Sequence, residues 1–259
     1  ELVAKKEDSV LWFQHEFGIW PDSARFVDML RDLDQIKVVS LHSLHFQNSE
    51  TTYGLRSHEY SFLRSLLPHT DAITVFSDGV YQALNRAFPE HRDKVHVIRH
   101  GIHLYPIIAR MSRGKAKARI HEYLISEPGL DQASKDDLGQ QSVFLDPNTI
   151  VIGTAGFINA SKGIEFLYHA HDLLQQMLPR RKIAAVHIGC LREVDNSGDS
   201  KFAVELRIRH NGTGQFFLET YLPEDVLPIL LRALDIYFYW PSDCTQSGIL
   251  AHALGAGAT

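Results

Sequence analysis

Residues 153–174 read GTAGFINASKGIEFLYHAHDLL, and this stretch decides the fold. An apolar strand ends near Gly156, a short loop follows, and a helix begins at Lys162-Gly163. Glycine lets a backbone approach a phosphate closely, and lysine adds a compact positive charge at the same place, so the turn is typical of phosphate binding. Taken alone, a helix that merely starts with Lys-Gly explains it equally well.

On both sides of this stretch, short apolar runs alternate with amphipathic ones, which is typical of βαβ units and parallel sheets. Strands are expected at 9–14, 37–42, 72–77, 94–100, 150–157, 183–189, 214–220 and 235–240. Helices are expected near 22–33, 54–68, 78–88, 115–125, 162–177, 200–210, 223–233 and 247–255. The sequence therefore predicts an α/β protein with two Rossmann-like parallel-sheet domains, 1–104 and 149–259, joined by a linker and surface insertion at 105–148.

Composition excludes several classes of protein. The 259 residues are 44% hydrophobic and 22% charged, as in a soluble globular protein, and no apolar run approaches the roughly 20 residues that cross a bilayer. No signal-peptide pattern is present, so a cytoplasmic location is expected. A net charge of −5 gives no general reason to bind nucleic acid. Five cations at 110–119 favour a solvated linker helix over contact with anionic lipid head groups.

No metal is expected. Cys190 and Cys244 lie far apart without paired spacing, which argues against a disulfide framework and a structural zinc site. His96 and His100 fall in one expected strand, where four residues span roughly 13 Å, too far to share an ion.

The first residue is not Met and the last residues stop within a turn, so we expect part of a longer protein with both domains incomplete.

The C-terminal segment 217–259 carries a second candidate phosphate site. A strand leads to the polar loop DCTQSG, and a helix of Gly and Ala follows it. The N–H groups at that helix start, with the helix dipole behind them, suit a diphosphate, although a purely structural loop is the alternative. Before it, a helix is expected to begin with Pro223 in its first turn.

Ligands of open parallel sheets bind at the carboxyl ends of the strands. Polar residues at those places are His15, Glu16, His42, Lys162 and the group 243–248. Trp12, Phe17 and Trp20 are compatible with a lipid-linked acceptor or with core packing, and core packing is favoured for Trp12.

The order of these segments resembles the donor domain of family-four retaining GT-B glycosyltransferases of the type that builds bacterial cell-surface polysaccharides or glycolipids. The resemblance is carried by GFI…SKGIEFL, FLETYLPEDVLPILLRALDI and SGILAHALGAGA. QHEFGIW, VVSLHS and VIRHGIH resemble the family's acceptor domain and the entry to its linker. The family's fold implies two Rossmann-like domains that face each other across a cleft.

The resemblance also implies residue roles. Donor contacts would come from Gly156 and Lys162 (diphosphate), Ser247 and Gly248 (phosphate N–H bonds), Tyr221 and Leu222 (base), and Asp243, Thr245 and Gln246 (sugar). His42 would lie beside the transferred sugar, with Lys162 as the second catalytic residue, and His15 and Glu16 would face the acceptor.

Three departures from the family pattern are present. Ile158 stands near the place of a phosphate-loop arginine, and Cys244 and His252 replace a pair of glutamates, one of which binds ribose. The first strand of the acceptor domain, with its Gly-rich loop, is not in the sequence. These departures bear on which donor is bound and on whether the chain is catalytically active.

The implied activity is metal-independent transfer of a hexosyl unit, with retention, from a UDP- or GDP-sugar to a saccharide or lipid-linked acceptor. Peripheral contact with the inner face of a membrane is left open. The alternatives are a degenerate GT-B protein that binds a nucleotide sugar without turnover, and a sugar-nucleotide epimerase. A paired-carboxylate hydrolase is disfavoured because Glu16 and Asp243 lie in different halves, and no G-x-G-x-x-G favours a nicotinamide enzyme.

Overall fold

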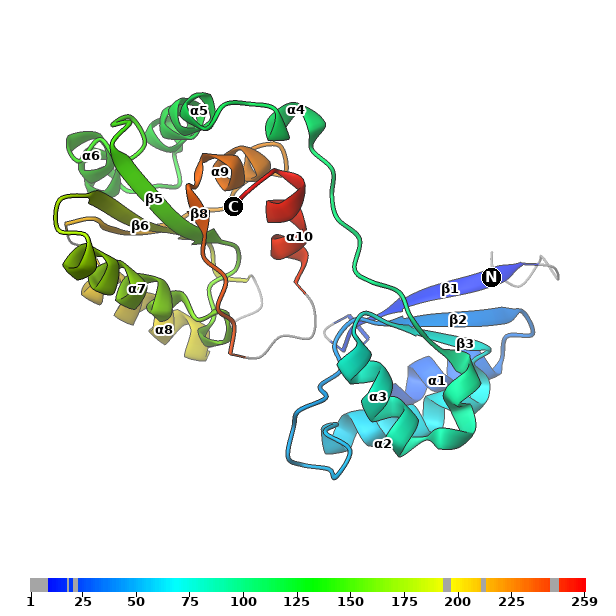
Figure 1. Cartoon of the computed structure of the whole chain (residues 1–259). Helices are drawn as coiled ribbons and strands as arrows, with labels where there is room; N and C mark the ends of the chain where they lie inside the picture. Colours follow the sequence, from blue (N-terminus) through cyan, green and yellow to red (C-terminus); the bar gives the residue numbers. More distant parts are fainter. Residues whose placement is uncertain (1–8, 18, 21–22, 193–196, 211–212, 243–246) are drawn as a thin grey trace. The chain divides into compact units, whose positions relative to one another are not determined.

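The computed structural model describes residues 9–17, 19–20, 23–192, 197–210, 213–242 and 247–259. The described residues up to His100 form most of one compact unit, and those from Gly101 onwards form the second. Each unit contains a four-stranded, all-parallel sheet with helices packed on it (Figure 1). The predicted α/β class with two Rossmann-like parallel-sheet domains is therefore confirmed.

The first unit is a regular run of strand–helix repeats. Its strands pair in the order β1-β2-β3-β4. They span β1 (Val10–His15), β2 (Ile36–Leu41), β3 (Ala72–Val75) and β4 (Val95–Val97). The helices are α1 (Ser23–Arg31), α2 (Ser57–Leu66) and α3 (Asp78–Ala87), with short 3₁₀ turns η1 (Leu67–His69) and η2 (Pro89–Lys94). Because each strand lies beside its predecessor, the three right-handed connections return on one face of the sheet (Figure 1).

Trp12 lies on the face of this sheet that α1, α2 and α3 do not cover. Strand side chains alternate between faces, and β1 alternates exposed with less exposed residues. The Trp12 side chain is 58% exposed, and its indole N–H donates to Ser40 Oγ at 2.7 Å. The prediction of core packing for Trp12 is wrong, since the strand period places it opposite the helices.

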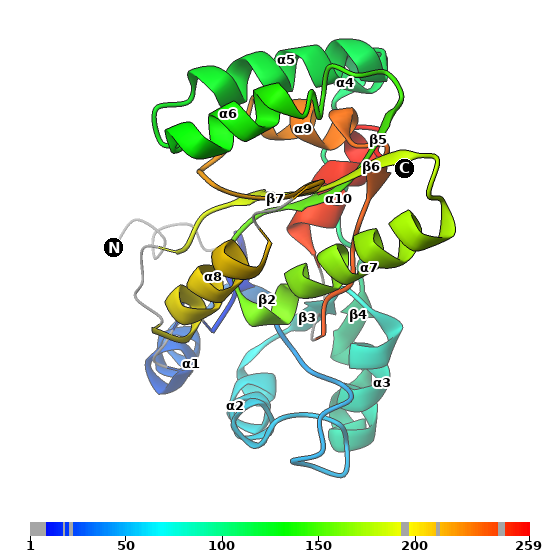
Figure 2. The same cartoon turned by 90° about the vertical axis from the view of Figure 1, so that its left-hand side faces the viewer.

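The second unit has a strand order that reverses. Its strands pair as β7-β6-β5-β8 and span β5 (Thr149–Ala155), β6 (Lys182–Gly189), β7 (Gln215–Glu219) and β8 (Ile236–Tyr237). The helices α7 (Ile164–Met177) and α8 (Ser197–Arg209) lie on one face, and α9 (Leu227–Ala233) lies on the other (Figure 2). The chain leaves β5 toward β6 and later returns to the opposite side of β5 as β8. The carboxyl ends of β5 and β8 therefore form a topological switch point.

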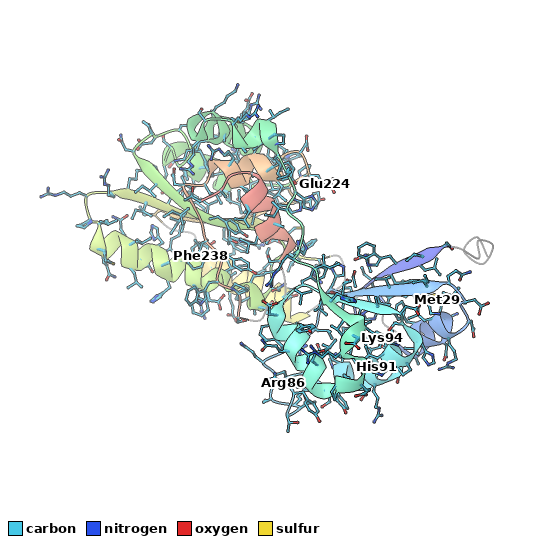
Figure 3. The ribbon with its side chains drawn as sticks, turned by 45° about the vertical axis from the view of Figure 1, so that its right-hand side comes forward. Met29, Arg86, His91, Lys94, Glu224 and Phe238 are labelled. Carbon is cyan, nitrogen blue, oxygen red and sulfur yellow. The ribbon has the colours of Figure 1, made fainter. Side chains whose placement is uncertain are left out.

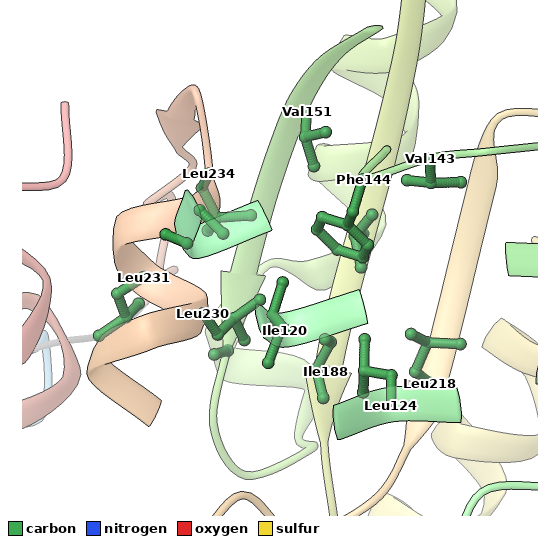
Figure 4. Close-up of a cluster of buried hydrophobic side chains, with 14 of the residues drawn as sticks. Ile120, Leu124, Val143, Phe144, Val151, Ile188, Leu218, Leu230, Leu231 and Leu234 are labelled. Atoms are coloured by element: carbon green, nitrogen blue, oxygen red, sulfur yellow. The ribbon is translucent and has the colours of Figure 1, made fainter. Parts of the chain in front are cut away.

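Residues 105–148 are not the predicted surface insertion. They form α4 (Pro106–Ala109), α5 (Arg113–Ser126) and α6 (Gln132–Gln140), and they cover the same face of the sheet as α9 (Figure 2). Ile120, Leu124 and Phe144 are buried with Val151 of β5 in the largest core cluster (Figure 4). The prediction failed because only a few apolar residues of α5, spaced four positions apart, make this packing, and their neighbours in sequence are polar.

Part of the basic run 110–119 is also internal. Lys117 is buried, and its ammonium donates to the Asp235 carboxylate at 2.6 Å and to the Thr149 carbonyl at 3.0 Å. Arg113 lies 3.8 Å from the same carboxylate. These two cations hold α5 to the amino-terminal edge of the sheet, whereas Arg110 and Arg119 are exposed.

Several element boundaries differ from the predicted ones. Helix α9 begins at Leu227, with Pro228 rather than Pro223 in its first turn, because residues 224–226 form a separate turn. The predicted strands 94–100 and 235–240 are shorter in the structure. The remaining elements are η3 (Ala160–Lys162) and α10 (Gly248–Gly255). Among the described residues, none of the helices has both the length and the apolar character needed to span a bilayer.

His187 of β6 makes stability depend on pH. Its ring is buried against Phe217, and neither ring nitrogen has a hydrogen-bond partner in the described part of the chain. Burial lowers the pKa of His187 to about 3. Below about pH 6.5 the unfolded chain binds a proton that the folded chain excludes, so stability falls by about 1.4 kcal/mol per pH unit as pH decreases toward 3.

Between pH 7 and pH 5, we therefore expect the free energy of unfolding of His187→Leu, measured by urea denaturation, to fall by about 2 kcal/mol less than that of the wild type. His96→Leu, which removes an exposed histidine on β4, is the control and should follow the wild type. Equal pH dependence in wild type and His187→Leu would contradict a neutral buried ring.

Candidate nucleotide-sugar site

A cavity of about 350 Å³ opens at the switch point of the second sheet. This is within the usual size range of small-molecule pockets. The residues that line it come from the loops after β5, β6 and β7 and from α9 and α10: Ala155, Gly156, Phe157, Lys162, Ile188, Gly189, Cys190, Thr220, Tyr221, Leu222, Glu224, Leu227, Gly248, Ile249 and His252. Five of the predicted donor residues therefore share one cavity although they are spread over 93 positions of sequence, from 156 to 248.

The floor of the cavity is built from backbone that extends the sheet. Gly156 N–H donates to the Ile188 carbonyl at 3.1 Å, and Thr220 N–H donates to the Gly189 carbonyl at 2.9 Å. These bonds continue the strand pairing just beyond β5, β6 and β7 and so fix the loops that follow these strands. The floor is therefore rigid backbone rather than mobile side chains.

The β5–α7 loop places Lys162 at the cavity wall. After Gly156 the chain makes the single turn η3, which ends at Lys162, and Gly163 takes a left-handed conformation with φ 64° at the start of α7. A Cβ on Gly163 would lie 2.1 Å from the Trp240 carbonyl oxygen, so only glycine lets the two loops approach this closely. The predicted strand–loop–Lys-Gly–helix arrangement is confirmed.

The Lys162 ammonium has no ion-pair partner among the described residues. Its side chain is half-buried and lines the cavity. A compact cation at the wall attracts a bound anion more strongly than one in bulk water, because the cavity lowers the local dielectric. The site is therefore suited to phosphate oxygens.

Helix α10 starts at the same cavity. Ser247 is its N-cap, and the Ser247 hydroxyl accepts the Leu250 N–H at 3.3 Å. Gly248 and Ile249 line the cavity from the first turn. A helix N-terminus carries about half a positive charge and several unpaired N–H groups, which favours an anion beside Gly248.

Removing the α10 cap should weaken both folding and ligand binding. We expect Ser247→Ala to lower stability by about 1 kcal/mol, because it frees the Leu250 N–H. Ser77→Ala is the matched control, since Ser77 caps α3 in the other unit through the Val80 N–H at the same 3.3 Å. Urea denaturation should show similar losses for both variants, with weaker nucleotide binding only in Ser247→Ala. Weaker binding in both would show that general stability, not the α10 terminus, governs affinity.

The part of the lining that follows β7 is more apolar. Tyr221 and Leu222 follow β7, and the Tyr221 side chain is 61% exposed. Glu224, labelled in Figure 3, lies in the turn between β7 and α9 and also lines the cavity. An aromatic ring, an aliphatic side chain and a carboxylate together suit a flat heterocycle with N–H groups.

Sequence reasoning did not assign a role to several residues at this site. His252 was noted only as a replacement for a glutamate, yet it lines the cavity and bonds the Tyr105 hydroxyl. The Arg192 guanidinium lies 5.2 Å from the centre of the Phe157 ring at the rim. Burial, with a smaller contribution from the Glu219 carboxylate, raises the pKa of the Cys190 thiol.

Ile158 does not belong to the cavity. Its side chain is buried in the core beneath α7, and its N–H donates to the Cys190 carbonyl at 2.9 Å. Three predicted donor residues, Asp243, Thr245 and Gln246, lie outside the described residues. Within the described residues, no three His, Cys, Asp or Glu side chains gather as a metal-binding group would.

The first unit has its own polar group at the carboxyl ends of β1 and β2. His42 Nε2 lies 2.8 Å from Gln14 Oε1, and the Ser43 hydroxyl donates to the Glu16 carboxylate. Burial lowers the pKa of His42; the Glu16 carboxylate opposes this shift, and His100 adds to it. His42 and His100 both contact the Phe76 ring, so His100 joins a group in which sequence reasoning had not placed it.

His15 is not at the surface where it was predicted to face an acceptor. Its ring is 1% exposed and packs among Phe17, Phe26 and Phe62. Burial lowers the pKa of His15 to about 4, so the ring is neutral at pH 7. As the last residue of β1, His15 points to the helix-covered face, and the next residue, Glu16, is the one that reaches the polar group.

No model of a known protein family matches the sequence, and no curated protein matches it. Solved structures do. An α,α-trehalose-phosphate synthase (UDP-forming) from Burkholderia xenovorans in complex with glucose-6-phosphate is 12% identical, with a TM-score of 0.65 over 98% of this chain and 58% of its own. The corresponding synthase from Burkholderia vietnamiensis is 14% identical, with a TM-score of 0.66 over 98% and 56%.

A structure of trehalose-6-phosphate from E. coli, bound with UDP-2-fluoro glucose, is 14% identical, with a TM-score of 0.63 over 97% of this chain and 56% of that one. The chain therefore spans a little more than half the length of the solved structures it resembles. At this level of identity the likeness concerns the fold: the chain has the two-domain Rossmann-like architecture of GT-B proteins.

Proposed function

We propose that this chain binds a nucleotide-diphosphate sugar in the cavity at the β5/β8 switch point and transfers the hexosyl unit to a saccharide acceptor. The observation that carries the proposal is the convergence of Lys162 and the α10 N-terminus on one cavity. The lysine and the helix N-terminus are both positive. They line the same cavity as Tyr221 and Leu222, so a nucleotide whose base contacted these two residues could place its diphosphate beside both positive groups. The structural neighbours are described as UDP-forming and as bound with a UDP-sugar, which supports UDP as the nucleotide.

Transfer in this site requires only orientation and charge. As the sugar leaves, negative charge grows on the diphosphate, and Lys162 with the N–H groups at Gly248 offsets it. The acceptor hydroxyl oxygen bonds to the anomeric carbon on the face from which the diphosphate leaves, so the anomeric configuration is retained. The leaving phosphate oxygen can take the acceptor proton, and no protein nucleophile is needed. We propose that no metal is needed, because the two positive groups occupy the position that a cation would fill.

The acceptor is proposed to be a saccharide or sugar phosphate, since a neighbour is described in complex with glucose-6-phosphate. We propose that Glu16 and His42 contribute to acceptor binding in the first unit. A second candidate is a nucleotide-sugar-binding protein without turnover. Ile158 favours this candidate, because an isoleucine with a buried side chain, and not an arginine, stands at that point of the phosphate loop.

Calorimetric titration of the chain with UDP, GDP and their glucose and mannose conjugates, with and without EDTA, tests the proposal. We expect UDP and UDP-glucose to bind with affinities that EDTA does not change. Transfer assays then separate the two candidates, since only a transferase releases UDP in an acceptor-dependent way. Binding of none of these ligands, or binding that EDTA abolishes, would refute the donor site as proposed.

A further inference from the structure

A second pocket, of about 200 Å³, lies in the first unit at the amino-terminal ends of its strands. Lys37 is the second residue of β2, Asp71 directly precedes β3, and Lys94, labelled in Figure 3, directly precedes β4. The polar residues that line the pocket are Arg31, Lys37, His69, Thr70, Asp71 and Lys94. The pocket is thus built from the last turn of α1, the 3₁₀ turn η1 and the starts of three strands.

This pocket is separate from the polar group of Glu16 and His42. Lys37 and His42 are five residues apart along β2, and a strand rises about 3.3 Å per residue, so the two residues lie roughly 16 Å apart. A ligand of a few atoms in one of these places therefore does not touch the other.

Two lysines of the pocket are held in place by main-chain carbonyls. Lys94 Nζ donates to the Leu67 carbonyl at 3.0 Å and to the Thr70 carbonyl at 2.7 Å, and Lys37 Nζ donates to the Leu33 carbonyl at 2.8 Å. Both side chains are half-buried. An ammonium has three N–H groups, so one on Lys94 and two on Lys37 have no acceptor in the part of the chain that the structure describes. Because both ammonium groups are already positioned, little side-chain entropy is lost when they bind a ligand.

The rest of the polar lining adds positive charge and further donors. Arg31 is exposed, and its guanidinium pairs with Asp28 at 2.9 Å, three residues earlier on α1. The His69 ring forms no hydrogen bond with another described residue. Asp71 is the only carboxylate among the lining residues, and it accepts the Lys37 main-chain N–H at 2.7 Å. Three cations therefore share the pocket with one carboxylate, which favours an anion.

We propose that this pocket binds a phosphate group, either inorganic phosphate or the phosphate of a small ester such as a sugar phosphate. Several oxygens on one centre suit N–H donors that come from Arg31, Lys37 and Lys94, and hydrogen bonds between two charged groups are strong. The volume is below the roughly 300–1,000 Å³ of pockets that enclose drug-sized ligands, so the phosphate itself is what fits. Binding here does not depend on the nucleotide-sugar function, because the pocket contains none of the donor or acceptor residues.

His69 reports on this pocket alone. In ¹⁵N-histidine NMR, its signals are assigned by their loss in His69→Gln and followed while sodium phosphate replaces sodium chloride at constant pH and ionic strength. We expect the His69 signals to shift and to saturate. Phosphate bound in the donor cavity does not disturb this measurement, since that cavity belongs to the other unit. No shift, or a shift that grows without saturating, would overturn the proposal.

Two variants should change the affinity for phosphate in opposite directions. Lys37→Met should weaken it by about 10-fold or more, the effect of losing one charge-assisted hydrogen bond. Asp71→Asn keeps an oxygen that accepts the Lys37 N–H but removes a negative charge, so it should tighten binding by about threefold or more. A damaged pocket only loses affinity, so Asp71→Asn decides the question even if Lys37→Met does not fold. Unchanged or weaker binding in Asp71→Asn would overturn the proposal.

Arg31→Gln and Arg99→Gln form a matched pair. Arg99 also makes an exposed ion pair, with Asp78 at 2.6 Å, but it follows β4 at the opposite end of the sheet. Arg31→Gln should weaken phosphate binding, and Arg99→Gln, with the same change of net charge, should leave it at the wild-type value. Equal weakening in both variants would overturn the pocket as the binding site.

Glucose-6-phosphate and glucose distinguish the sources of the phosphate. A saturable His69 shift with glucose-6-phosphate would support a phosphate ester as the ligand, and a shift with inorganic phosphate alone would support the free ion. Glucose should give no shift. An equal response to glucose and glucose-6-phosphate would contradict recognition of the phosphate group.

Discussion

Replacing Lys162 with alanine is expected to lower the kcat/KM of sugar transfer by about 100-fold or more, the effect of removing one preorganised charge from a developing oxyanion. The ammonium stands at the cavity wall without an ionic partner among the described residues, so its charge is available to the ligand. UDP release from UDP-glucose, with glucose-6-phosphate as acceptor, measures the change. Affinity for UDP should also fall, because part of the charge is present before the reaction.

Lys201→Ala is the control for this experiment. Lys201 is an exposed lysine on α8 in the same unit, outside the cavity, and its loss changes the net charge equally. The control should keep the wild-type rate. Equal losses in both variants would attribute the effect to overall charge, and full activity in Lys162→Ala would remove Lys162 from the mechanism.

Gly189→Ala is expected to destabilise the second unit by about 3 kcal/mol, the upper part of the usual range for an overpacked site. Its Cβ would lie 1.8 Å from the Gly156 carbonyl oxygen and 2.9 Å from His187 Nε2. Both loops are held by sheet-like backbone bonds, so neither moves aside at low cost. Urea denaturation measures the loss, and UDP affinity should fall with it because the cavity floor is displaced.

Gly139→Ala provides the comparison. Gly139 lies within α6, and a Cβ there meets nothing within 4 Å. Alanine favours a helix over glycine by roughly 0.5–1 kcal/mol, so this variant should be as stable as the wild type or slightly more so. A Gly189→Ala protein of wild-type stability would mean that the β5 and β6 loops do not approach as closely as described.

Hydrophobic periodicity predicted most of the fold. The segment 150–157 was expected as a strand and β5 occupies Thr149–Ala155, because an unbroken apolar run between turns has few other uses. Helix α6 was missed because its sequence QASKDDLGQ is mostly polar, and essentially one side chain, Leu138, anchors it to the core. Tertiary packing, not local pattern, decides such a helix.

The cavity at the β5/β8 switch point was also largely predictable, because the carboxyl ends of parallel strands must meet at one edge. Gly156, Lys162 and Gly248 were named from the sequence and line a single cavity. The pairing of Tyr105 with His252 was not predictable, since it depends on how a segment before α4 packs on α10. His15 was misplaced because a strand end has two faces, and β1 turns this residue toward the aromatic core.

The most direct test of the account is a crystal structure of the chain with UDP bound. The account predicts that the diphosphate lies within hydrogen-bond distance of Lys162 Nζ and of the first N–H groups of α10, with the base against Tyr221 and Leu222. UDP bound elsewhere, or with its phosphates pointing away from Lys162 and Gly248, would contradict the central claim that the β5/β8 switch point is a nucleotide-sugar site.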